Sequence, residues 1–468
     1  MSVAIKEPKT ETRIIWDSDT LERMNVQVDG KFEAGFLRVP VERMRLRRYV
    51  EFEKLAMLAI CGQLPSVPVY EDIGNLAEIA YEDVLLAIRL EERNHEHPGG
   101  KREKIDEEAF EEFTRHLDHP DSLAEFYGNL FEVLCKAQLE AYKRHRAESD
   151  EFFNRPTAKI LEDAIATKRA QIKWGGDRYR EMLRDLDEAE RSAVRKRVRT
   201  FRSLLKWSGG VDGTLSGTKP AIELGSMEPI PEEVNFDPAF KFDTGYMSRE
   251  DTLYWRENRI KFDGVDENGN EITDRGYQLY SYCCEIDVFL QFAMIIYRAS
   301  RDLPLGFYRD TTRQLWDEFR HTSMGHRVMR LNGIDPMDLI RPMRWTVWRQ
   351  MSVAENYAWI TQTGEACSLV GKHKQRKNFI SDGRFHEQTL IEWDISDESQ
   401  HVRYGARWFR AVLDDDEFEG SSKQFVINAT EKFNWLYYQH MKRLDIIPKG
   451  LEEPKPYRGC VEYETLGA

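Results

Sequence analysis

The chain has 468 residues, which leaves room for several domains. Lys and Arg number 68 and Asp and Glu number 82, so the formal net charge is −14. An acidic balance of this size disfavours binding to nucleic acid or to anionic membranes, because both need a basic face. The 41% hydrophobic and 32% charged residues are typical of a helix-rich protein with a solvated surface.

Targeting signals are not evident. The most apolar stretch, residues 288–297, is interrupted by Gln291 and has about half the length that spans a bilayer. The first residues, MSVAIKEPKTETR, lack the apolar region of a secretory signal. The 6 cysteines contain no C-x-x-C pair, which favours reduced thiols. The sequence therefore predicts a cytoplasmic protein without a membrane partner.

Helical periodicity dominates the first half, after an N-terminal extension of residues 1–40. We expect helices over 41–64, 74–95, 121–148 and 156–205, the last broken at Gly175 and Gly176. Residues 41–207 should form one bundle.

A connector rich in Gly and Pro follows at 208–275. Within it, IKFDGVDENGNEITD alternates apolar and polar residues around Asn268-Gly269, which predicts a small β-hairpin. Further helices are expected over 276–301, 308–332, 347–378, 386–413 and 422–442. They define a second bundle at 276–445 and a C-terminal tail at 446–468.

The two halves resemble each other. The segment QIKWGGDRYREML, from Gln171, aligns without gaps on HVRYGARWFRAVL, from His401, at a shift of 230 residues. The segments around Glu53 and Glu285 align at a similar shift of 232. The repeat predicts an all-α chain of two four-helix bundles packed face to face. Two unrelated amphipathic bundles with chance similarity are the alternative.

One motif, Asp-Glu-x-x-His, occurs twice in the second half, at 317–321 and at 397–401. Glu and His three residues apart lie on the same face of a helix, so each pair could bind one metal ion. A looser match ends at His95, just before HPGGKREK, where exposure at a helix end is expected. Single matches of this kind arise by chance, so the surrounding residues decide.

Two further glutamates complete a metal-binding pattern. Glu285 lies in an apolar stripe, where an unpaired carboxylate is costly unless a cation meets it. Glu365 lies on the third helix, and Glu355 could replace it. The distance from Glu285 to Glu318 and that from Glu365 to Glu398 are both 33 residues, which favours Glu365. Each interval fits a helix, a turn and an antiparallel return.

With these residues, 276–413 resembles the ferritin-like di-iron carboxylate superfamily, in which two Glu and two Glu-x-x-His motifs hold two ions. The resemblance implies a ligand set of Glu285, Glu318, His321, Glu365, Glu398 and His401. An Asp before each motif is similar to the pattern of bacterial multicomponent monooxygenases. It implies that Asp317 holds His401 and that Asp397 holds His321, which would fix the tautomers of the ligating rings.

The first half departs from this pattern. In the repeat alignment Lys168 takes the place of Glu398 and Gln171 that of His401. An ammonium cannot bind a metal ion, so we expect a degenerate copy without metal, in which Lys168 pairs with an acid. A second substrate or regulator site there is the alternative.

The resemblance implies an O₂-activating non-haem di-iron oxygenase or oxidase, with two Fe ions, or a Mn/Fe pair, and O₂ as co-substrate. A small organic substrate would undergo hydroxylation, epoxidation, desaturation or N-oxygenation. No flavin or nicotinamide motif is evident, so we expect a separate ferredoxin or reductase, and an oligomer is compatible with the pattern. The run KHKQRK, 372–377, is interpreted as a solvated helix end or as a contact for an anionic substrate. A ferroxidase or iron-handling protein and a metal-free scaffold are the alternatives.

Overall fold

The structure is a computed structural model. It describes residues 37–98, 108–150, 152–232, 282, 285–331, 344–412, 420–443, 447 and 451–456. All the regular elements within these ranges are helical, so the expected all-α class is confirmed. The expected hairpin at 260–274 lies outside the described residues, as do the N-terminal extension up to residue 36 and the tail from residue 457.

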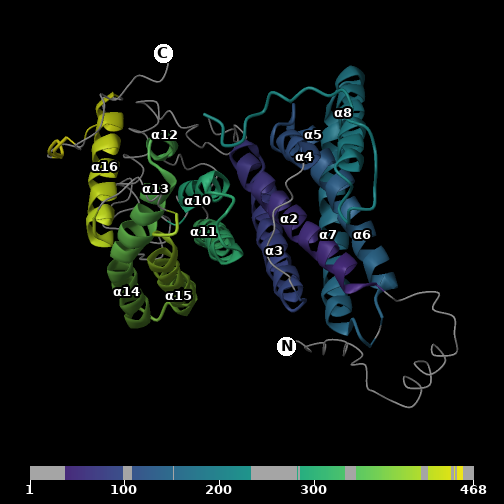
Figure 1. Ribbon diagram of the computed structural model, residues 1–468. Helices are drawn as coiled ribbons and strands as arrows, with labels where there is room; N and C mark the ends of the chain where they lie inside the picture. Colours follow the sequence, from purple (N-terminus) through teal and green to yellow (C-terminus); the bar gives the residue numbers. More distant parts are fainter. Residues whose placement is uncertain are drawn as a thin grey trace, which may run out of the picture.

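The first half is a group of helices whose first two long members lie on the side that faces the second half (Figure 1). In chain order they are α2 (Val39–Gln63), a 3₁₀ turn (Leu64–Ser66), α3 (Tyr70–His95), α4 (Glu108–Asp118), α5 (Leu123–Tyr127), a π-helical segment (Gly128–Cys135), α6 (Lys136–Glu148), α7 (Arg155–Asp185) and α8 (Glu188–Trp207). Helix α2 packs on α3, α3 on α7, and α6 on α7. Helix α4 was not expected from the sequence.

One expected helix, 156–205, is two helices, and the break does not lie at Gly175 and Gly176. Helix α7 runs through both glycines because Gly175 lets the ring of Phe131 approach its backbone, where a Cβ would overlap the ring. The chain breaks instead before α8, whose first turn is closed by a capping box between Asp187 and Glu190. The glycine pair therefore marks close packing of α7 on the π-helical segment.

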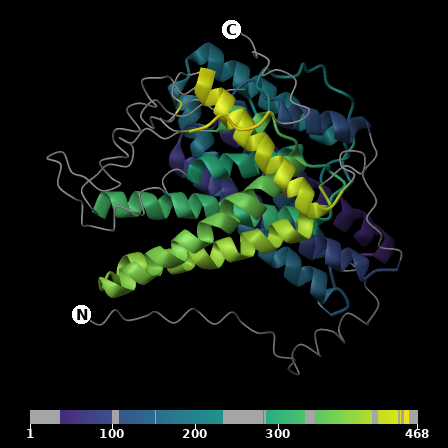
Figure 2. The ribbon, with the colours of Figure 1, turned by 90° about the vertical axis from the view of Figure 1, so that its left-hand side faces the viewer.

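The second half consists of α10 (Ile286–Arg298), α11 (Leu305–Leu331), α12 (Trp345–Arg349), α13 (Val353–Trp359), a π-helical segment (Ile360–Gly364), α14 (Glu365–Ser381), α15 (Phe385–Trp408) and α16 (Ser422–Arg443). Helix α10 begins directly after Glu285, and the expected start of this helix at 276 lies outside the described residues. The expected helix 347–378 is divided, because a capping box between Ser352 and Glu355 starts α13 anew. Figure 2 shows α14 and α15, in light green, side by side as an antiparallel pair.

The halves meet through the first two helices of each: α2 contacts α10, and α3 contacts α11. Aromatic side chains fill the second contact. Tyr70 lies 4.7 Å from Phe319 and Tyr81 lies 5.7 Å from Trp316, measured between ring centroids. Gly74 of α3 has no side chain, and a Cβ there would overlap the ring of Phe319. The interface therefore places the outer face of α11 against α3 and leaves its other face for the site. Within the described ranges, none of the helices combines the length and the apolar character that crossing a membrane requires.

Candidate metal centre

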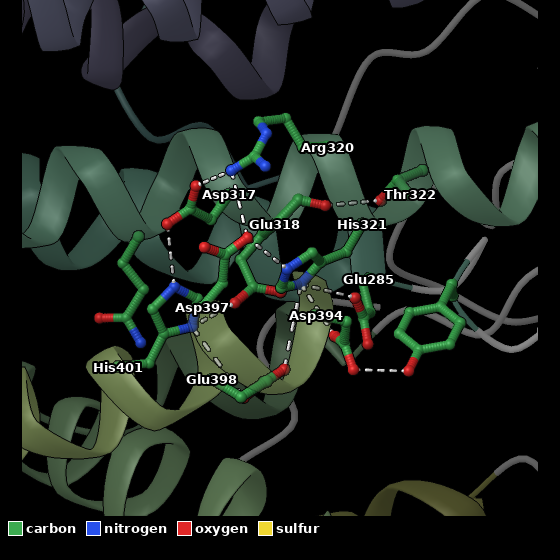
Figure 3. Close-up of polar contacts among 12 residues, drawn as sticks. Glu285, Asp317, Glu318, Arg320, His321, Thr322, Asp394, Asp397, Glu398 and His401 are labelled. Atoms are coloured by element: carbon green, nitrogen blue, oxygen red, sulfur yellow. Dashed lines mark hydrogen bonds and ion pairs between the residues drawn. The ribbon is translucent and has the colours of Figure 1, made fainter. Parts of the chain in front are cut away.

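Four helical segments of the second half bring together seven side chains that could hold metal ions. Figure 3 labels six of them, all but Glu365. The seven side chains fall into two groups. Site A contains Glu285, His321, Asp394 and Glu398, and site B contains Glu318, Glu365 and His401. In each group one ligand atom per residue lies within 4.8 Å of the others. The structure thus places all six sequence-derived ligand candidates in these two sites.

Helix geometry positions these groups. Glu318 and His321 project from one face of α11, and Glu398 and His401 project from one face of α15, because residues three apart share a helical face. Glu285 immediately precedes α10, and Glu365 is the first residue of α14, directly after the π-helical segment Ile360–Gly364. Such π-helical insertions re-aim the residues that follow them and are frequent at functional sites.

Two glutamates connect site A with site B. The carboxylate of Glu318 places Oε1 3.3 Å from Nδ1 of His401 and Oε2 3.8 Å from Nδ1 of His321. Glu398 is arranged in the same way, with Oε1 3.9 Å from Nδ1 of His321 and Oε2 4.0 Å from Nδ1 of His401. The two imidazole centroids are 6.0 Å apart. Each glutamate therefore presents one oxygen to each site, as bridging carboxylates do.

The outer nitrogens of both imidazoles face an aspartate. Nε2 of His401 lies 3.3 Å from Oδ2 of Asp317, and Nε2 of His321 lies 3.4 Å from Oδ2 of Asp397. These are the cross-helix pairs that the resemblance implies. Arg320 forms ion pairs with both aspartates and so fixes them relative to each other (Figure 3). A proton held on Nε2 leaves Nδ1 of each ring free to bind a metal ion.

Asp317→Asn is expected to weaken divalent-ion binding by about 10- to 100-fold, because the amide no longer favours the tautomer with the proton on Nε2 of His401. Mn(II) titration followed by EPR measures this. Asp310→Asn is the matched control: Asp310 is also a buried aspartate of α11, but it accepts hydrogen bonds from Arg407 and Trp408. Equal affinities of Asp317→Asn and the wild type would show that Asp317 does not hold the ring.

Burial and the neighbouring charges shift the pKa values of the carboxyl groups in the site. Burial raises the pKa of Glu365 to about 8 and that of Glu398 to about 7. Burial also acts against ionisation of Glu318, but the imidazoles of His321 and His401 close to its carboxylate lower its pKa to about 2. Carboxylates this crowded either take up protons or bind a cation.

Unpartnered buried atoms show that the residues fit metal ions. Carboxylate oxygens of Glu285, Glu318, Glu365 and Glu398 have no hydrogen-bond partner among the described residues, nor does Nδ1 of either site histidine. All these atoms belong to residues of sites A and B, and burial of polar atoms without a hydrogen bond is costly. Oxygen-rich groups with one imidazole each suit Fe(II) or Mn(II).

Glu355, the alternative to Glu365, lies outside both sites. Its Oε2 accepts a hydrogen bond from the backbone N–H of Ser352 and lies 2.6 Å from Nζ of Lys432. Glu365 instead lies with Oε1 3.4 Å from Nδ1 of His401. The helix-three candidate within reach of the centre is therefore Glu365.

Two site residues were missed. Asp394 places Oδ1 3.6 Å from Nδ1 of His321, and its Oδ2 accepts a hydrogen bond from the hydroxyl of Tyr282. It lies one helical turn before Glu398, which was the available signal. The interpretation of 372–377 as a solvated run is wrong for Lys372, which is only 9% exposed and lies 2.6 Å from Oε1 of Glu398.

The first half holds a buried ion-pair cluster around Lys168. Nζ of Lys168 lies 2.7 Å from Oε2 of Glu53 and 2.7 Å from Oδ1 of Asp83. Nε2 of Gln171, also on α7, donates to Glu82 and Asp83 of α3 at 3.0 Å. Glu92 and His95 are exposed at the end of α3. The ammonium satisfies acids that would otherwise be available to a metal ion.

Comparison with known families gives one match. A family model described as "Protein of unknown function (DUF455)" matches residues 284–445, a segment that contains every residue of sites A and B. No curated protein and no solved structure matches the chain.

Proposed function

We propose that the chain is an O₂-activating non-haem di-iron oxygenase or oxidase that acts on a small organic substrate. The observation that carries this proposal is the bridging placement of Glu318 and Glu398, each of which presents one oxygen to His321 and one to His401. Two buried sites joined in this way suit a pair of ions a few Å apart. The resemblance to ferritin-like di-iron proteins supports the same reading.

Nine residues of the chain would hold the two ions or orient their ligands. Glu285, His321, Asp394 and Glu398 would hold one ion, while Glu318, Glu365 and His401 would hold the other. Asp317 and Asp397 would orient the two rings and keep a proton on their outer nitrogens. Iron would supply the redox chemistry with O₂, and the protein would fix its geometry and exclude water.

We further propose a duplicated architecture, in which the first half is a ferritin-like bundle that has replaced its metal site by Lys168. Support comes from the matching positions of Lys168 and Gln171 on α7 and of Glu398 and His401 on α15. Electrons would come from a separate ferredoxin or reductase. A cytoplasmic location is consistent with Cys61, Cys135 and Cys367, all free thiols.

Anaerobic reconstitution with Fe(II) tests the proposal. We expect about two Fe per chain by elemental analysis, and consumption of O₂ when reductant is supplied. Mössbauer spectroscopy should show two coupled irons after exposure to O₂. A chain that binds no iron would refute the metal-based proposal. If the O₂ consumed were accounted for entirely by Fe(III) released to solution, the ferroxidase alternative would replace it.

A further inference from the structure

An ammonium lies against site A. Nζ of Lys372, on α14, is 2.6 Å from Oε1 of Glu398, 2.8 Å from Oδ1 of Asp394 and 3.8 Å from Oε1 of Glu285. It therefore contacts all three carboxylates of site A. Two of these oxygens, Oε1 of Glu398 and Oδ1 of Asp394, are the atoms that face Nδ1 of His321.

Site B has different partners. Within the described part of the chain, the ion pairs of Glu318 and Glu365 are with imidazoles alone. Oε1 of Glu365 also accepts a hydrogen bond from the neutral amide of Gln314, at 2.8 Å. A divalent ion at site B would thus displace no ammonium.

The first half contains a second buried ammonium that bridges two carboxylates. Lys168 bridges Glu53 and Asp83 at 2.7 Å each, as Lys372 bridges Glu398 and Asp394. The two lysines reach their clusters from different helices, α7 and α14, so this pairing does not follow from the repeat alignment. In both clusters one ammonium occupies oxygens that a metal ion would otherwise use.

We infer that Lys372 makes the two metal positions unequal, so that site B takes up a divalent ion first and site A binds the second ion more weakly. Site A has three carboxylates and site B has two, so site A would be the tighter one without Lys372. The ammonium reverses this order because it occupies two of the oxygens and repels a second cation nearby. Loading would then be stepwise, and Lys372 would withdraw from Glu398 and Asp394 as site A fills.

This inference rests on the proposed function, since it presupposes that both sites bind metal. Mn(II) is the probe, because its EPR signal reports free, singly bound and paired ions without reaction with O₂. In the wild type we expect a tight step and a step that is weaker by about tenfold or more. Glu285→Gln is expected to remove the weak step, which would assign it to site A.

Lys372→Gln and Lys372→Met are the decisive variants, and circular dichroism checks that each is folded. Both should tighten the weak Mn(II) step by about tenfold or more, whereas Lys372→Arg, which keeps the charge, should leave it weak. Lys374→Gln is the matched control, because Lys374 is exposed on the same helix and the substitution removes the same charge. A general effect of net charge would appear in this control as well.

The outcomes separate the inference from the proposed function. Two equally tight steps in the wild type, unchanged in Lys372→Gln, would overturn the inference and leave the di-metal proposal standing. Weaker binding in both neutral variants would also overturn it, because Lys372 would then support site A. If neither the wild type nor Lys372→Gln bound Mn(II), both the inference and the proposed function would be wrong.

Discussion

Replacing Glu318 by Ala is expected to abolish binding of both metal ions. Glu318 has one oxygen 3.3 Å from Nδ1 of His401 and the other 3.8 Å from Nδ1 of His321, so the substitution removes an oxygen from each site at once. His401→Ala should also abolish stoichiometric binding, because it removes the imidazole of site B. The metal content after anaerobic Fe(II) reconstitution, determined by elemental analysis, should fall from about two per chain to near zero in Glu318→Ala and well below two in His401→Ala.

The helical content of both variants should survive, because the stability of a bundle comes mainly from apolar packing. Glu318→Gln keeps the size of the side chain and removes only its negative charge, so it shows whether the charge or the volume of Glu318 matters. The control is Glu355→Ala: Glu355 is also a glutamate of the second half, and it contacts Ser352 and Lys432 outside both sites. Two ions retained in Glu318→Ala, or lost in Glu355→Ala, would show that the ligand assignment is wrong.

Helix periodicity was sufficient to place most helices of this chain, because their buried faces repeat every three to four residues. It failed where the local geometry depends on a distant partner. Gly175 resembles a helix breaker in the sequence, yet the ring of Phe131 packs where its side chain would be. The π-helical segment Ile360–Gly364 has no periodic signature, although it sets the position at which Glu365 enters site B.

The residues of the candidate site could be predicted from the sequence where they form a motif with helical spacing. Glu318 with His321, and Glu398 with His401, are three apart, and that pattern located both α11 and α15. Asp394 and Lys372 follow the same geometry, four residues before Glu398 and seven after Glu365, but they belong to no recognised motif. The ammonium in particular could be placed only in three dimensions, since a run of basic residues at a helix end is usually solvated.

The second large effect is expected in the first half. Lys168→Met should lower the free energy of unfolding by about 3–5 kcal/mol, because it leaves the carboxylates of Glu53 and Asp83 buried without their counter-ion. Chemical denaturation followed by circular dichroism measures this loss. Metal binding by folded Lys168→Met should remain at the wild-type level, because Lys168 contacts no residue of sites A or B.

The pH dependence of the stability lost in Lys168→Met shows whether the buried carboxyl group of Glu53 causes the loss. Burial raises the pKa of Glu53 to about 8, so between about pH 4.5 and 8 the folded chain binds more protons there than the unfolded chain. The contribution of Glu53 to stability therefore falls as the pH rises. In Lys168→Met this fall should extend to higher pH, since the ammonium that lowers the pKa of Glu53 is gone.

A compensating variant completes the test. Adding Glu53→Gln and Asp83→Asn to Lys168→Met removes the unpaired charges, and it should recover much of the lost stability, because neutral replacement of a whole buried ion pair is often tolerated. Gln138 and Tyr142, which donate to Glu53, can still bond to the amide oxygen of a glutamine. If the triple variant were no more stable than Lys168→Met, lost packing of the lysine stem would explain the effect. Lys168 would then not be the counter-ion that replaces a metal in the first half.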